Sequence, residues 1–87
     1  MTRGEQNLRS LAGKFADERG LTYNVTHELA GIRAEFIAAP GPDGKRLFMA
    51  STLSWLEVYK FMKPEMESVL RQWEAAWANR DRWSGGK

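Results

Sequence analysis

The sequence predicts one small α+β domain with the element order α-β-β-β-α-α, in which a three-stranded antiparallel meander carries its helices packed on one face. Apolar stripes with helical spacing run near both ends of the chain, and the segment between them alternates apolar and polar residues as strands do. With 87 residues the chain has room for a single hydrophobic core. We therefore expect one domain over residues 1–83 and a flexible tail, rich in glycine, over residues 84–87.

The first helix is predicted by a start signal, an apolar stripe and a stop signal. Thr2-Arg3-Gly4-Glu5 has the form of a capping box, in which a hydroxyl and a carboxylate each accept from the other residue's backbone amide. Arg19 and Gly20 supply a cationic last turn and a left-handed stop. The stripe between these signals consists of Leu8, Leu11, Ala12 and Phe15.

Three strands are expected next. Residues 21–28 alternate with period two, a tight connection follows at 29–31, and residues 32–38 alternate again before Pro40. Pro40-Gly41-Pro42-Asp43-Gly44 is the strongest turn signal in the chain, because its prolines preset φ and its Asp-Gly pair tolerates positive φ. The third strand is predicted over residues 47–50.

Two helices complete the predicted order. Ser54-Trp55-Leu56-Glu57 is a second capping-box pattern and starts a helix over residues 55–62. Pro64 suits the first turn of a new helix, so we expect a break at Lys63-Pro64. The last helix carries an apolar stripe made of Met66, Val69, Leu70, Trp73, Ala76 and Trp77. The predicted core comprises Leu11, Phe15, Val25, Phe36, Leu47, Leu70 and Trp73.

The composition argues against catalysis and against bound cofactors. The chain has no cysteine and one histidine, which excludes Cys-His catalysis and histidine-rich zinc sites. It has no G-x-S-x-G turn, P-loop, dinucleotide fingerprint or calcium loop. His27 is expected to be a half-exposed strand residue, with a hydrogen-bonding or pH-sensing role as the alternative. We therefore expect a non-enzymatic protein without cofactor or metal.

The distribution of charge disfavours nucleic acid as the main partner. The net charge of +2 equals the net charge of residues 80–87, so the rest of the chain is neutral. A nucleic-acid site remains the alternative, and it would use the basic residues Lys45, Arg46, Arg80, Arg82 and Lys87. The absence of cysteine, of an apolar leader and of any long apolar run predicts a cytoplasmic protein that does not enter a membrane.

The aromatic residues indicate a protein-binding surface. Trp73 and Trp77 belong to the core stripe, whereas Trp55 and Trp83 have no obvious place in the core. Residues 55–62 are apolar nearly all round, so this helix is either buried between the sheet and the last helix or exposed to a partner, including a second copy of the chain. The predicted partner-binding residues are Trp55, Tyr59, Arg80, Arg82 and Trp83. If these residues belong to the core, the next candidates are the polar faces of the helices and the open sheet face, which carries Asn24, Arg33 and Glu35.

The order of elements resembles two groups of proteins. The α-β-β-β-α part is similar to the double-stranded RNA-binding domain, which implies RNA binding through a loop histidine and a lysine cluster. The corresponding places here hold Leu29-Ala30-Gly31 and Ser54-Trp55-Leu56-Glu57, so those residues do not carry over. The whole chain also resembles some small phage-encoded inhibitors, anti-CRISPR proteins among them. That resemblance implies a regulator or inhibitor of a larger protein or nucleoprotein complex.

Overall fold

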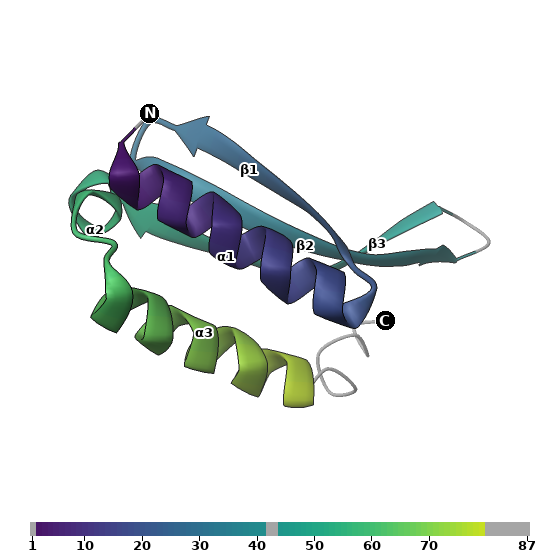
Figure 1. Cartoon of the computed structure of the whole chain (residues 1–87). Helices are drawn as coiled ribbons and strands as arrows, with labels where there is room; N and C mark the ends of the chain where they lie inside the picture. Colours follow the sequence, from purple (N-terminus) through teal and green to yellow (C-terminus); the bar gives the residue numbers. More distant parts are fainter. Residues whose placement is uncertain (1, 42–43, 80–87) are drawn as a thin grey trace.

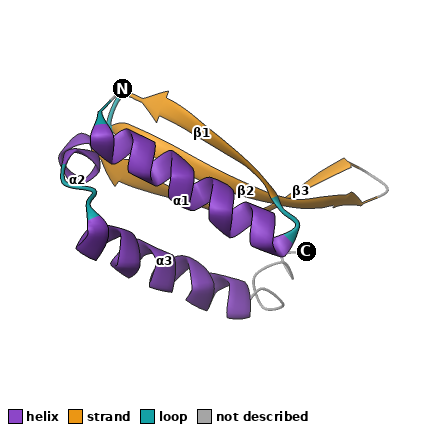
Figure 2. Ribbon diagram, in the orientation of Figure 1, coloured by secondary structure: helices purple, strands orange, loops and turns teal. Residues whose placement is uncertain are grey.

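The computed structural model of the chain describes residues 2–41 and 44–79, and for residues 39–41 and 44–47 the backbone alone. The elements in chain order are α1 (Arg3–Arg19), β1 (Thr22–Glu28), β2 (Gly31–Gly41), β3 (Gly44–Ser54), α2 (Trp55–Tyr59) and α3 (Lys63–Ala78). The strands form one antiparallel sheet in the order β1-β2-β3 (Figure 1). Figure 2 shows the same arrangement by secondary structure, with α1 and α3 running in the same direction. The predicted fold class and strand order are confirmed.

Local signals set the limits of α1. The Thr2 hydroxyl accepts a hydrogen bond from the Glu5 amide at 3.1 Å, which caps the first turn. Gly20 ends the helix in the left-handed conformation with φ of 69°, a conformation that glycine adopts without strain. The predicted stripe faces inward, and its members Leu8, Leu11, Ala12 and Phe15 are all buried.

The sheet has one packed face and one polar face. The pairing of Val25 with Ala34 and of His27 with Ile32 places these residues on the face that α1 and α3 cover. Arg33 and Glu35 alternate with them on the other face, where their side chains form an ion pair at 2.9 Å. Antiparallel sheets commonly pack one face on the core and expose the other face to solvent.

The third strand is longer than the sequence analysis predicted. It spans Gly44–Ser54 rather than 47–50, because Ser51, Thr52 and Leu53 continue the alternation and pair with β2. The pairing shifts by one residue opposite Phe36 and Ile37, which is a β-bulge. Phe48 and Met49 are consecutive and yet both belong to the buried core, an arrangement that a regular strand does not allow.

The centre of the core is a group of three aromatic side chains from three elements. The Phe36 ring on β2 lies 4.9 Å from Phe15 on α1 and 4.8 Å from Trp73 on α3. Leu11, Phe15, Phe36 and Trp73 are buried as predicted. Val25 and Leu70 were predicted in the core but are only partly buried at its margin, because they lie on the edge strand and on the flank of α3. The side chain of the remaining predicted core residue, Leu47, lies outside the described part.

The break between the last two helices lies earlier than predicted. The helix expected over residues 55–62 ends at Tyr59, and α3 begins at Lys63. A continuous helix would bring the ring of Pro64 against the carbonyl of Lys60, four residues before it, so the first helix ends there. Pro64 lies in the first turn of α3, where its missing amide hydrogen costs no bond. The Glu65 carboxylate accepts from the Met62 amide at 3.2 Å and caps that turn.

Candidate protein-binding surface

Short-range hydrogen bonds define α2 even though it has only five residues. The Ser54 hydroxyl accepts from the Glu57 amide at 3.2 Å, and the Glu57 carboxylate accepts from the Ser54 amide at 2.7 Å. This is the capping box that the sequence predicts. Val58 on α2 and Phe61 just after it are buried at 2% and 1% exposure, so they anchor the segment to the core.

The first two turns of α1 also contact α2 and the link that follows it. Gly4 packs so closely against α2 that a Cβ on Gly4 would overlap the carbonyl oxygen of Val58. One turn later, the Asn7 side-chain amide donates to the carbonyl of Phe61 at 2.8 Å. Contacts on both sides of α2 therefore fix its orientation before any partner binds.

Apolar side chains gather on the side of α2 that faces solvent. The described residues include six exposed large hydrophobic side chains, and five of them belong to α2, to the link after it or to the neighbouring β1–β2 turn. Tyr59 is 71% exposed and Leu29 is fully exposed. We call these five residues the α2 surface: Leu29, Trp55, Leu56, Tyr59 and Met62.

Trp55 connects the α2 part of this surface with the β1–β2 turn, which carries Leu29. Its indole N–H donates to the carbonyl of Leu29 at 2.9 Å, which ties α2 to the β1–β2 turn. Its ring meets the His27 ring edge-to-face at a centroid distance of 5.5 Å. The side chain nevertheless remains 43% exposed, so an oriented indole is available for contact.

Beneath Trp55, His27 takes part in a charged network. His27 Nε2 lies 2.8 Å from a Glu5 carboxylate oxygen, to which it donates, and Arg9 contacts the same oxygen at 3.1 Å. The hydrogen bond from His27, followed by that from Arg9, outweighs burial and holds the pKa of Glu5 below its usual value. Glu5 was expected to complete a capping box with Thr2. Its carboxylate instead binds His27 and Arg9, because the fold brings β1 against the first turn of α1.

The structure brings together only part of the predicted partner-binding set. Trp55 and Tyr59 lie one helical turn apart on the exposed side of α2, whereas Arg80, Arg82 and Trp83 lie outside the described residues. Leu29, Leu56 and Met62, which complete the α2 surface, were not among the predicted partner-binding residues. A helix that is apolar all round signals surplus apolar area, but it does not show which residues face outward.

The basic residues of the nucleic-acid alternative are not assembled by the described structure. Lys45 and Arg46 lie near the hairpin end of β3, which is the end of the strand away from α2. Their side chains and the whole of Lys87 lie outside the described part. The open sheet face presents Asn24 beside Glu35, which already pairs with Arg33.

The described part of the chain holds neither a metal-binding cluster nor a membrane-spanning helix. Residues 2–41 and 44–79 contain no group of three histidine or acidic side chains placed to hold a metal ion. None of the helices described is both long enough and apolar enough to cross a bilayer. Comparison of the chain with protein-family models, curated proteins and solved structures gave no match.

Proposed function

We propose that this chain is a small non-enzymatic binding protein that regulates or inhibits a larger protein or nucleoprotein complex through the α2 surface. The observation that carries the proposal is the concentration of exposed apolar side chains at one end of the molecule. Exposed apolar patches that a monomer does not need for folding are typical of protein contact sites. Trp and Tyr are also the residue types that contribute most to binding energy at such sites.

The rigidity of the α2 surface supports the same proposal. The capping box, the Asn7 bond and the Trp55 bond hold α2 without using the outer sides of Leu56 or Tyr59. A preorganised surface loses little conformational entropy on binding, which favours affinity. The inhibitor class, of the phage or mobile-element type, and a cytoplasmic location are parts of this proposal, and they agree with the layout and composition.

A matched pair of tyrosine substitutions tests the proposal. Partners retained from source-cell extract by the immobilised wild-type protein are identified by mass spectrometry, purified and titrated by calorimetry. Tyr59→Ser should weaken binding by at least about tenfold, because a true hot spot contributes about 1–2 kcal/mol or more. Tyr23→Ser, at the exposed tyrosine on β1, should change the affinity less than about twofold.

Measurements of stability and of self-association distinguish a lost partner contact from an unfolded variant and from a homodimer. Tyr59→Ser should keep the wild-type melting temperature, because the side chain is mostly solvated. Sedimentation velocity over a concentration series shows whether the partner is a second copy of the chain. Wild-type affinity in Tyr59→Ser, or unfolding of that variant, would contradict the proposed surface.

A further inference from the structure

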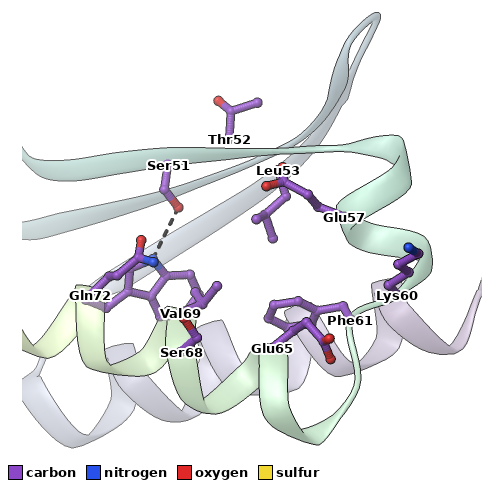
Figure 3. A pocket seen from close by; sticks show the side chains of 11 residues that line it. Ser51, Thr52, Leu53, Glu57, Lys60, Phe61, Glu65, Ser68, Val69 and Gln72 are labelled. Carbon is purple, nitrogen blue, oxygen red and sulfur yellow. Dashed lines mark hydrogen bonds between the residues drawn. The ribbon is translucent and has the colours of Figure 1, made fainter.

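A groove of about 340 Å³ lies between β3 and α3, and α2 closes one end of it (Figure 3). Its apolar lining comes from Leu53, Phe61, Val69 and Trp73. Its polar lining comes from Ser51, Thr52, Glu57, Lys60, Glu65, Ser68 and Gln72. None of these residues belongs to the α2 surface, so the groove is a separate feature of the molecule. Its volume is that of a ligand-binding cleft.

The groove exists because two tryptophans hold α3 away from the sheet. Trp73 reaches Phe36 and donates its indole N–H to the Ser51 hydroxyl at 3.2 Å, while Trp77 packs on Phe48 at 5.1 Å. One turn before Trp73, α3 carries the smaller Val69 beside Ser68. These side chains are too short to fill the space that the indoles impose, so the cleft remains open toward solvent.

One wall of the groove is the outer edge of the sheet. The strand order β1-β2-β3 leaves β3 with a strand neighbour on one side only among the described residues. Along such an edge, alternate backbone N–H and C=O groups point away from the sheet. Figure 3 shows Leu53 directed from this strand toward α3 and the Phe61 ring directed into the same space. At residues 51–53, where β3 pairs with β2 alone among the described strands, this edge therefore lies directly beside an apolar recess.

The rim of the groove at the α2 end is acidic. Glu57 and Glu65 both line it, and each carboxylate accepts a backbone hydrogen bond at a helix N-terminus. Lys60 is the one basic side chain among the lining residues, all of which are described, so the lining has a net negative charge. A ligand with a basic side chain at this end would complement that charge.

We infer that the groove binds an extended segment of a partner protein, which adds to β3 as a fourth strand. Backbone hydrogen bonds along Ser51–Leu53 provide the attachment, and alternate side chains of the segment face the cleft. A large apolar side chain fills the space between Leu53, Phe61 and Val69, and a basic side chain two residues along the segment, on the same face, approaches Glu57 and Glu65. This site is independent of the α2 surface, so either site can fail its test without the other.

Designed peptides are the probe. The binding peptides are capped decapeptides of alternating Val and Thr that carry Leu, Phe or Trp at one middle position and Lys two positions before and two positions after it, on the same face. A second peptide has Thr in place of both Lys, and a third has Pro beside the central residue. Titration of the isotope-labelled full chain, followed by amide NMR, should shift the signals of residues 51–53, 68 and 72. Some amides of residues 51–53 should exchange more slowly with solvent, because they become hydrogen-bonded to the added strand.

Two arginine substitutions on α3 provide the matched comparison. Ser68→Arg fills the groove and should weaken binding of the Lys-bearing peptides by at least about tenfold, whereas Ala75→Arg, at an exposed position outside the groove, should change it less than about twofold. The Pro peptide should not bind, because proline removes a backbone donor and disrupts strand pairing. The peptide without Lys should bind about threefold more weakly at low salt.

Four results would each overturn the inference. The first is that no peptide binds at millimolar concentration, whichever central residue it carries. The second is that the Pro peptide binds as tightly as the peptides without Pro, and the third is that Ser68→Arg binds the Lys-bearing peptides as tightly as the wild-type chain. The fourth is a wild-type dimer that Ser68→Arg converts to a monomer, since the occupant of the edge would then be a second copy. Tyr59→Ser should leave peptide binding unchanged, which separates this site from the proposed function.

Discussion

The two glycines inside α1 should respond in opposite ways to the same substitution. Glycine to alanine within a helix ordinarily stabilises a protein by about 0.5–1 kcal/mol, because alanine loses less backbone entropy. At Gly13 an added Cβ would lie 3.2 Å from the Tyr23 hydroxyl, which is the far end of an exposed side chain that can move. Gly13→Ala should therefore be neutral or stabilising by up to about 1 kcal/mol.

At Gly4 the added Cβ meets backbone that cannot move away by a change of rotamer. It would overlap the carbonyl of Val58, so α1 and α2 must separate, which strains the Asn7–Phe61 hydrogen bond. Overpacking of this kind costs about 1–3 kcal/mol, which exceeds the gain in helix propensity. The difference between Gly4→Ala and Gly13→Ala should thus be about 1–3 kcal/mol, or roughly 5–20 °C in melting temperature.

Thermal and urea unfolding followed by tryptophan fluorescence measure this difference directly. Both variants should keep the wild-type m-value, because the surface exposed on unfolding hardly changes. A Gly4→Ala variant as stable as Gly13→Ala would refute the close packing of α1 on α2. It would also remove the argument that α2 is held rigidly.

Three further predictions concern the core, the charged network and nucleic acid. In urea unfolding, Phe36→Ala should lower the free energy of unfolding by about 3–5 kcal/mol, because Phe36 is fully buried. Leu70 is only half-buried, so Leu70→Ala should lower it by about 1–2 kcal/mol, and equal losses would contradict the position of Leu70 at the margin of the core. Because the Glu5 carboxyl has a lowered pKa in the folded state, its bond to His27 stabilises the fold above the ordinary carboxyl range, and this stability is lost as the pH falls through the folded pKa. Wild type should exceed Glu5→Gln in stability at pH 7, and the gap should shrink as the pH falls from above the ordinary carboxyl pKa through the lowered pKa of Glu5; a constant gap would argue against the network. Fluorescence titration with duplex DNA and RNA should give dissociation constants of about 1–100 μM that weaken steeply with salt, and tight binding at physiological salt would favour the nucleic-acid alternative.

Part of this structure could be read from the sequence because it depends on neighbours in the chain. The Ser54–Glu57 capping box, the left-handed Gly20 and the effect of Pro64 are local matters of backbone geometry. The inward stripe of α1 follows equally from helical spacing. The helix order, the strand order and the presence of surplus aromatic residues were therefore predictable.

Tertiary contacts decided the features that matter most for binding. Nothing near Glu5 in sequence indicates that its carboxylate binds His27 on β1, because that contact depends on how α1 crosses the sheet. Which side of α2 is buried depends on Val58 meeting α1 and the core, and this leaves Leu56 and Tyr59 exposed. The groove beside β3 depends on how far two indoles hold α3 from the sheet. Distances between elements arise from side-chain packing across the whole fold, whereas a sequence pattern specifies only the faces that have to pack.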